Sequence, residues 1–441
     1  MKVLMLGWEL PPFISGGLGT ACKGIADSLV ENNIKLTFVI PTGRGGDSVL
    51  DSRIKVICAD KYLPAENYLK DFYEKNSVKN KKRDKYNREL QSVNFSDFSP
   101  YYTSYAGSTD KKSEEEILEK IYLHKEHSIL NFEGNYGRNL LEEVMKYSYI
   151  GRALGKEESF DIIHAHDWMT YPAAISAKEV SGKPLVVHVH STEYDRSWVR
   201  PNKSIIGIER EGFGKADKII AVSFYTKNMI ISKYGVSPDK IEVVHNAVNR
   251  DTQYLRYQIR KSFDEKIVLF LGRITQQKGP DYFLDAAVKI LNKMNNVKFV
   301  MSGSGDMFPK IVSKMAEYDL ADKFHFTGFL ENTMVEKIFA MSDLYVMPSV
   351  SEPFGLSPFE ALLYDIPVVI SKQSGASEIL KNAPKVNFSD TDELAATIIK
   401  LLEDKEYREK VVSQCKEDMR SISWKNSAAR IVEIYSKLLE I

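Results

Sequence analysis

Two carboxylates on either side of a short turn form the most informative pattern in this chain. Glu352 and Glu360 flank Pro353-Phe354-Gly355, between a strand-like apolar run and a helix-like apolar run. A turn that opens a helix after a strand exposes backbone N–H groups at the positive end of the helix dipole, where anions bind. One carboxylate can reach sugar hydroxyls and the other a ribose, with a diphosphate between them. The pattern therefore predicts a nucleotide-sugar site.

Two cations follow a predicted strand nearer the middle of the chain. Arg273 comes just after the run Ile267–Leu271, and Lys278 stands five residues later. When a nucleotide-sugar is cleaved, negative charge grows on the departing diphosphate, and fixed cations stabilise it. A surface pair with this spacing can also arise by chance, but its place after a Gly-Arg turn favours diphosphate binding. Gly303, which follows the next predicted strand, could admit a nucleobase or phosphate, or could belong to a simple turn.

Glycines also separate the first predicted strand from a helix expected over 23–31. Gly16 and Gly17 begin the sequence Gly-Gly-Leu-Gly. Glycine lets the backbone approach a ligand closely, although a tight turn that only reverses the chain has the same composition. The spacing differs from that of a dinucleotide fingerprint. Combined with the two carboxylates, the turn indicates a ligand-facing loop.

Polar side chains end two further predicted strands. Ligands of open α/β sheets bind beyond the carboxyl ends of the strands, so we expect His166 to touch substrate and His164 to be buried. No recognisable zinc ligand set accompanies them, and we predict no metal site. After the next strand, His190, Glu193 and Arg196 could hydrogen-bond acceptor hydroxyls; an ion-pair network beside the next helix is an equally open alternative.

Length and composition limit the classes of protein. A chain of 441 residues predicts two domains, and 60 Lys plus Arg against 60 Asp plus Glu argues against a general nucleic-acid binder. Three dispersed cysteines form neither a metal motif nor a disulfide framework, which favours a reducing compartment. The apolar run at the N-terminus is too short for a signal peptide. We expect a cytoplasmic protein.

Short β-branched runs alternate with amphipathic segments, which predicts an α/β fold of two doubly wound, Rossmann-like domains. We expect a first domain over 1–248, a second over 249–423, and a C-terminal helix over 424–441 that closes the second domain or crosses back to the first. The predicted strands are Val3–Leu6, Leu36–Ile40, Ile54–Cys58, Ile162–His164, Leu185–His190, Ile219–Val222, Ile241–Val244, Ile267–Leu271, Lys298–Met301, Phe324–Thr327, Leu344–Met347 and Val368–Ile370.

The region from about 60 to 139 interrupts this alternation. It is rich in Lys, Glu, Asn and Tyr and includes the basic run Lys79–Arg83. A segment of this kind is a solvated insertion or a binding flap. Tyrosines could offer stacking surfaces to sugar rings, and the basic run could touch anionic lipid.

Together, these motifs resemble the GT-B glycosyltransferases, closest to the retaining family 4 group that is related to glycogen and starch synthases. The resemblance covers nearly the whole chain apart from the 60–139 region. The segments that match best are Gly16–Gly19, His164–Trp168, Gly272-Arg273, Lys278-Gly279 and Glu352–Glu360, with Val243–Val248 similar to the hinge before the second domain.

The resemblance implies a role for each donor-binding residue. Arg273 and Lys278 would bind the diphosphate, together with backbone N–H groups of Gly355 and Leu356. Glu360 would hold the ribose hydroxyls.

For the transferred sugar, the resemblance implies that Glu352 holds its hydroxyls and that His166 supports the oxocarbenium-like state. Gly16 and Gly17 would leave room for the diphosphate from the opposite domain. Reaction with retention, without an obligatory metal or further cofactor, is implied. Ile14 stands where glycogen and starch synthases carry a lysine, which favours the broader family 4 group over an ADP-glucose glucan synthase.

The predicted function is transfer of a hexose, of the UDP- or ADP-glucose type, to a hydroxyl of a glucan, sugar or sugar phosphate. Two alternatives stay open: a nucleotide-sugar epimerase of the same fold, and a transferase that acts on a lipid-linked acceptor at a membrane surface. The sequence leaves the base, the hexose, the acceptor and the oligomeric state undecided.

Overall fold

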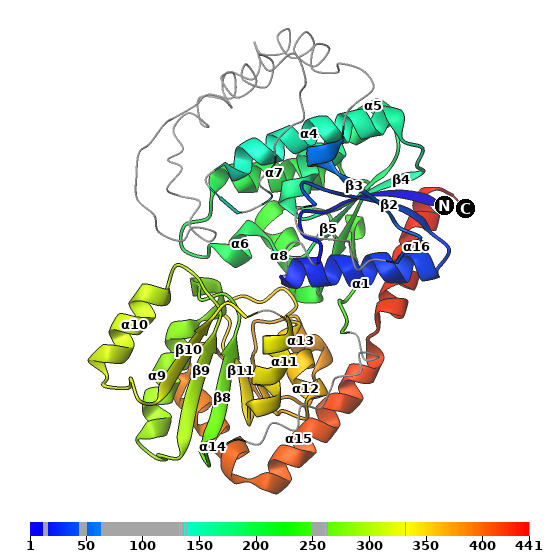
Figure 1. The fold of residues 1–441 in the computed structure, drawn as a ribbon. Helices are drawn as coiled ribbons and strands as arrows, with labels where there is room; N and C mark the ends of the chain where they lie inside the picture. Colours follow the sequence, from blue (N-terminus) through cyan, green and yellow to red (C-terminus); the bar gives the residue numbers. More distant parts are fainter. Residues whose placement is uncertain are drawn as a thin grey trace.

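The computed structural model contains two parallel sheets, one above the other in Figure 1, each covered by helices. It describes residues 1–11, 16–43, 51–62, 132, 134, 136–137, 139–248, 261, 263–330 and 332–440. The insertion predicted between 60 and 139, with its tyrosines and basic run, therefore lies almost wholly outside the described residues, whereas the predicted hinge segment Val243–Val248 lies within them.

The first sheet has the strand order β3-β2-β1-β4-β5-β6-β7, and every neighbouring pair is parallel. Its strands read as nearly continuous apolar runs because both faces are covered. The strands are β1 (Lys2–Leu6), β2 (Lys35–Ile40), β3 (Lys55–Cys58), β4 (Ile162–His166), β5 (Leu185–Val189), β6 (Lys218–Ala221) and β7 (Ile241–Val243).

Two layers of helices enclose this sheet. One face packs on the helices α4 (Leu140–Glu157), α5 (Tyr171–Ser181) and α7 (Lys203–Lys215) through a core that includes Trp168 and Phe213. The opposite face packs on α1 (Gly17–Glu31) and α16 (Trp424–Leu438). The short α6 (Glu193–Arg196) and α8 (Phe224–Tyr234) follow β5 and β6.

The second sheet has the order β10-β9-β8-β11-β12-β13, again parallel throughout. A single apolar core joins it to its helices. Its elements are β8 (Lys266–Leu271), η6 (Gln276–Lys278), α9 (Pro280–Leu291), β9 (Val297–Ser302), α10 (Phe308–Glu317), β10 (Phe324–Gly328), α11 (Asn332–Met341), β11 (Leu344–Met347), α12 (Ser357–Leu363), β12 (Val368–Ser371), α13 (Ala376–Ile379), β13 (Lys385–Val386), α14 (Thr391–Glu403) and α15 (Lys405–Asp418).

The last helix leaves the second domain and packs on the first, where its end lies near the N-terminus (Figure 1). Ser423 caps it, since its hydroxyl accepts a hydrogen bond from Asn426 N at 3.1 Å. The apolar stripe Ile431, Ile434 and Tyr435 is buried beside α1. Each end of the second domain is thus connected to the first.

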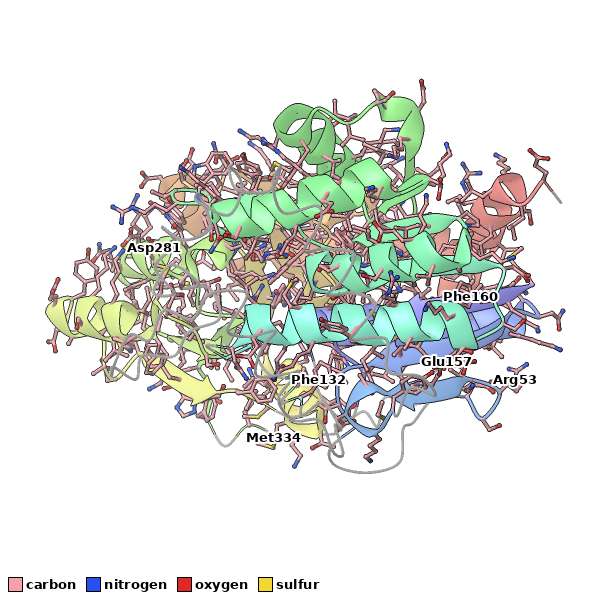
Figure 2. The ribbon with its side chains drawn as sticks, turned by 90° about the horizontal axis from the view of Figure 1, so that it is seen from above. Arg53, Phe132, Glu157, Phe160, Asp281 and Met334 are labelled. Atoms are coloured by element: carbon pink, nitrogen blue, oxygen red, sulfur yellow. The ribbon has the colours of Figure 1, made fainter. Side chains whose placement is uncertain are left out.

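The fold class and the predicted strands are confirmed, with shifts of one or two residues at strand ends. β13 was missed because two residues carry no detectable periodicity. In the part of the chain that the structure describes, no helix combines the length and apolarity that crossing a membrane would need. Seen from above, Asp281 and Met334 mark the second domain, and Arg53, Glu157 and Phe160 mark the far end of the first (Figure 2).

Candidate active site

The predicted phosphate-binding cations lie at the carboxyl end of β8, where ligands of open α/β sheets bind. Lys278 ends η6, and its Nζ lies 2.5 Å from Glu352 Oε2. The same carboxylate oxygen accepts a hydrogen bond from the Ser349 hydroxyl at 3.1 Å. The Lys278 side chain is 23% exposed and that of Glu352 only 7%. Arg273, on the loop before η6, is exposed. The structure thus joins Lys278 to one of the two predicted carboxylates, 74 residues away in sequence.

Glycines bring the backbone of this region close together. Gly303 has φ +134°, and a Cβ there would lie 1.9 Å from the carbonyl oxygen of Gly272. No side chain fits at that position, so the turn after β9 packs directly against the turn after β8. Gly355, with φ +87°, forms the bend after Glu352, and a Cβ there would lie 3.0 Å from Glu352 Cγ.

Glu360 lies in α12, whereas Glu352 lies in the loop between β11 and α12. It is partly exposed, yet protein atoms surround its carboxyl group, and this burial raises its pKa to about 7. Among the described residues no side chain caps α12. The N–H groups of Gly355 and Leu356, which were predicted to bind the diphosphate, lie just before Ser357, where α12 begins.

The first domain holds the Glu352 loop in place. The Ser351 hydroxyl donates to Asp195 Oδ1 at 2.6 Å and also pairs with the Tyr225 hydroxyl at 2.9 Å. Ser223 Oγ donates to the carbonyl oxygen of Pro353 at 2.5 Å. These bonds cross the domain boundary, so the position of the predicted donor loop depends on how the two domains meet.

A second contact between the domains lies at the start of α8. The Glu378 carboxylate, from α13, accepts hydrogen bonds from Phe224 N at 2.9 Å and Tyr225 N at 2.7 Å. His245 Nε2 lies 2.9 Å from the same carboxylate. A carboxylate of one domain thus caps a helix of the other, an arrangement that the helix dipole favours.

Two acids on the first-domain side were missed as site residues by sequence reasoning. Glu9, after β1, accepts a hydrogen bond from Gly19 N at 3.0 Å and thereby caps α1 below the predicted Gly16-Gly17 loop. A Cβ on Gly16 would lie 2.8 Å from Glu9 Oε2, whereas nothing lies within 4 Å of one on Gly17. Burial raises the pKa of Glu9, and the positive charge of Arg273 in the other domain opposes that rise.

Asp167 is the second of these acids. It is 4% exposed, has φ +59°, and accepts hydrogen bonds from His190 N at 2.7 Å and Ser191 N at 3.3 Å. Burial raises its pKa to about 6 against the opposing charges of Arg196 and Arg273. The available signal was an acid directly after a strand-end histidine, which points to the carboxyl edge of the sheet but not to a role.

Four histidines form a stack on the face of the first sheet that α1 and α16 cover. Neighbouring rings of His164 and His166, and of His188 and His190, are 4.5 Å apart and inclined by 18°. His164 Nε2 pairs with His188 Nδ1 at 3.2 Å, and His166 Nδ1 with His190 Nε2 at 2.9 Å. The Tyr435 hydroxyl of α16 bonds His164 Nδ1. His164 is buried as predicted, and His166 is equally buried at 0% exposure.

Two groups within this stack have ligand atoms close enough to suggest a metal site: His164, His166 and His188, and Cys22, His166 and His190. A metal ion lies in the plane of each imidazole that binds it. In the first group, His164 and His188 meet edge to edge with facing nitrogens 3.2 Å apart, whereas the His166 ring stacks 4.5 Å from that of His164, so one ion cannot lie in all three ring planes. In the second group, the facing nitrogens are at hydrogen-bond distance. The geometry favours a hydrogen-bonded histidine stack.

The predicted acceptor contacts of Glu193 and Arg196 need correction. Both side chains are at most 2% exposed. Arg196 Nη2 lies 2.8 Å from Glu209 Oε1 and its Nε 3.5 Å from Glu193 Oε2. Glu193 Oε1 accepts from Asn202 N at 2.9 Å. These residues form the ion-pair network that was the alternative interpretation, and each charged group already has a partner within the first domain. His190, also predicted to bind acceptor, instead faces His166.

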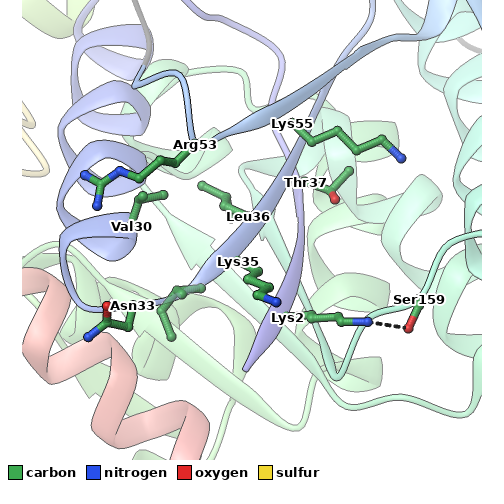
Figure 3. A pocket seen from close by; sticks show the side chains of 10 residues that line it. Lys2, Val30, Asn33, Lys35, Leu36, Thr37, Arg53, Lys55 and Ser159 are labelled. Atoms are coloured by element: carbon green, nitrogen blue, oxygen red, sulfur yellow. Dashed lines mark hydrogen bonds between the residues drawn. The ribbon is translucent and has the colours of Figure 1, made fainter.

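A hollow of about 580 Å³ lies away from this site (Figure 3). It is lined by Lys2, Lys35 and Lys55, which open three neighbouring strands, so it is at the amino edge of the first sheet. Lys55 pairs with Glu158 at 2.8 Å, and the nearby Arg53 pairs with Asp51. The hollow is a surface feature remote from the carboxyl edge, where the candidate residues meet.

Comparison with known families identifies the architecture. The model for glycosyl transferases group 1 matches residues 251–418, and the model for glycosyltransferase family 4 matches residues 103–252. The two glycosyltransferase models thus match successive parts of the chain, from residue 103 to residue 418. An uncharacterised glycosyltransferase of Methanocaldococcus jannaschii is 29% identical, with 100% of this chain and 99% of that protein covered.

Solved structures of low identity share the GT-B fold of this glycosyltransferase. Sucrose-phosphate synthase from Thermosynechococcus elongatus has a TM-score of 0.71 at 16% identity, covering 100% of this chain and 99% of that one. HepE from Anabaena, in complex with UDP and glucose, has a TM-score of 0.65 at 16% identity, covering 99% and 100%. The two sheets of this glycosyltransferase therefore form the two halves of a GT-B enzyme.

Proposed function

We propose that this glycosyltransferase transfers a hexose, of the glucose type, from a nucleoside-diphosphate sugar to a hydroxyl of a carbohydrate or sugar phosphate, with retention and without a required metal. The observation that carries the proposal is the pairing of Lys278 with Glu352 beside Arg273, at the carboxyl end of β8. Lys278 and the carboxylate predicted to bind sugar are in direct contact there, and Arg273 precedes Lys278 in the segment that follows β8.

The charges support a site that receives an anion. Arg273 is exposed, and its positive charge opposes the burial that raises the pKa of Glu9 and of Asp167 in the other domain. A bound diphosphate would compete with these two carboxylates for the guanidinium. Lys278, one-quarter exposed, could turn from Glu352 to the phosphate and leave Glu352 to accept hydrogen bonds from the sugar.

In the proposed reaction, the bond between the anomeric carbon and the β-phosphate oxygen breaks and its electron pair stays on the nucleoside diphosphate. Arg273, Lys278 and the N–H groups at the start of α12 would stabilise that charge. The acceptor oxygen bonds to the same face of the sugar, and its proton passes to the departing phosphate oxygen. His166, near the reacting face, would contact the sugar when donor binds.

The relatives' chemistry agrees with this donor class. HepE is described in complex with UDP and glucose, and a structural neighbour, starch synthase IV from Arabidopsis thaliana, with ADP and acarbose. Both matching family models are glycosyltransferase models, which favours transfer over the epimerase alternative. A lipid-linked acceptor remains a variant of the same proposal.

The direct test is calorimetry of the full chain with UDP, ADP and GDP, each with and without EDTA. We expect one of the three to bind in the micromolar range, unaffected by EDTA. The corresponding hexose donors are then incubated with glucose, sugar phosphates and short glucans, and NMR identifies the anomeric configuration of any product. Absence of binding by all three at millimolar concentration would contradict the proposal, and an inverted product would contradict retention.

A further inference from the structure

The pair formed by His166 and His190 links two neighbouring strands at the edge of the candidate site. His166 ends β4, and His190 follows β5, two residues beyond the partner that faces His166 in the sheet register. Their facing nitrogens, His166 Nδ1 and His190 Nε2, are 2.9 Å apart. Asp167, next to His166, accepts the backbone N–H of His190. Asp167 therefore fixes the main chain of the residue that contacts His166.

Both rings are electrically neutral in this setting. Burial holds the pKa of His166 well below its usual value of 6.5 and lowers that of His190 to about 3. A neutral imidazole carries one N–H and one bare nitrogen. A hydrogen bond between the two rings therefore requires that one facing nitrogen is protonated and the other bare.

This requirement couples the free ends of the two rings. If His190 Nε2 donates to His166 Nδ1, the proton of His166 is on Nε2, and that atom is a donor. If His166 Nδ1 donates, its Nε2 is an acceptor. His166 Nε2 and His190 Nδ1 are buried and have no hydrogen-bond partner among the described residues. A buried polar nitrogen without a partner is costly, so each such atom calls for an explanation, and a ligand group that completes the bond is one.

We propose that His190 is a positioning residue that sets the ring orientation and tautomer of His166, so that His166 Nε2 meets a hydroxyl or oxygen of the donor sugar. The inference rests on the proposed function, because it assumes that His166 faces the sugar. It replaces the direct acceptor contact predicted for His190. The bond fixes the direction in which His166 Nε2 points, because the His166 ring cannot turn without losing its hydrogen bond to His190.

His188 provides a matched comparison on the same strand. Its ring is as deeply buried as that of His166 and stacks 4.5 Å from His190. Its hydrogen bond, however, goes to His164 and through it to Tyr435. A change at His188 disturbs the packing of the stack without removing the bond between His166 and His190.

The experiment compares His190→Phe, His190→Gln and His188→Phe, with kcat and KM measured for the donor. Phe keeps the ring shape and removes the bond, whereas the Gln amide can donate or accept at a similar reach. We expect His190→Phe to lower kcat by about 10-fold to 100-fold, the cost of a misplaced group, with KM within about twofold. His190→Gln should recover most of kcat, and His188→Phe should keep kcat while losing similar thermal stability.

Equal kcat in the two His190 variants, or an equal loss in His188→Phe, would overturn the positioning role and leave the proposed transfer standing. A measurement on the unaltered protein keeps the idea testable if the variants do not fold. Nitrogen-15 NMR of labelled histidines should show one protonated and one bare nitrogen at the facing positions. Two bare nitrogens, as a bound metal would leave, refute the pair, and this readout needs no turnover.

Discussion

Two clusters of opposite charges face each other where the domains meet, and their side chains are of the same kinds. The Arg196 network consists of Glu193, Arg196 and Glu209 and belongs to the first domain; the Lys278 cluster consists of Arg273, Lys278 and Glu352 and belongs to the second. α6, which carries part of the network, contacts η6, which carries Lys278. The Arg196 side chain is 2% exposed, whereas that of Lys278 is 23% exposed.

The difference in burial distinguishes a network that stabilises the fold from a cluster that is accessible to a ligand. Arg196 is held by two carboxylates and by the carbonyl oxygen of Ser191 at 3.1 Å. Burial raises the pKa of Glu209 to about 8 even with Arg196 beside it. Buried charges need such partners, and their partners keep them from a ligand. The cations of the Lys278 cluster are more accessible, and under the proposed function they exchange a partner for a phosphate.

Substitution of Arg196 should therefore lower the free energy of unfolding more than any change in the Lys278 cluster. We expect Arg196→Leu to lower the free energy of unfolding by about 3–5 kcal/mol, because two buried carboxylates lose their cation. The loss should be larger at pH 9 than at pH 6, since protonation at low pH neutralises Glu209. Urea unfolding at both pH values measures it.

A loss under about 1 kcal/mol at both pH values would show that Arg196 is not structural. Activity per folded molecule is the complementary readout. If the folded fraction of Arg196→Leu keeps the wild-type KM for acceptor, the buried network has no contact with acceptor.

The sequence predicted the architecture well because both sheets are buried on both faces. Their strands are apolar runs bounded by turns, and this signal is local. The pairing of Lys278 with Glu352 was predicted only as membership of one site, since contact across 74 residues depends on the strand order. Composition alone could not distinguish Glu193 and Arg196 from ligand-binding residues, because burial decides their role.

The position of Glu9 and the partner of His190 depend on tertiary structure, and sequence reasoning missed both for that reason. Glu9 is one of many acids in the sequence, and only the fold brings it to the first turn of α1. His190 has a polar neighbourhood that suits a ligand contact, and only the stagger of β4 and β5 places its ring against His166. Local sequence patterns thus predict the fold class and the candidate residues, whereas contacts between residues distant in sequence depend on the tertiary structure.

The Lys278 cluster should show the opposite response to a mutation. Lys278→Ala should lower kcat/KM for donor by roughly 100-fold or more, since loss of one charge-stabilising donor costs on the order of 3 kcal/mol in the transition state. Stability should change little, because Glu352 keeps the Ser349 hydroxyl. Steady-state kinetics and thermal unfolding measure the two effects.

Lys310→Ala is the matched control, since Lys310 lies in the same domain with a side chain 64% exposed and makes only a surface ion pair. It should leave both quantities unchanged. Wild-type turnover in Lys278→Ala, or a loss of stability as large as that of Arg196→Leu, would contradict the contrast between the ligand-binding Lys278 cluster and the structural Arg196 network.

Substitution of Glu360 should give the smallest of the three effects, a change in the pH dependence of donor binding. It compares an acid of the predicted donor site with the acids of the Arg196 network. The pKa of Glu360 is raised from 4.5 to about 7 by burial, so on this account the folded protein binds its proton more tightly than the unfolded chain, and the stability from that proton is lost as pH rises through 7. Ribose hydroxyls that donate to the carboxylate favour its ionised form. Binding of UDP-glucose, whose diphosphate does not titrate near neutrality, should therefore weaken by at most about tenfold per pH unit below 7.

Calorimetry between pH 5.5 and 8.5 on wild type and Glu360→Gln isolates this group from Asp167. A variant that kept the wild-type slope would place the titrating group elsewhere and remove Glu360 from the ribose site.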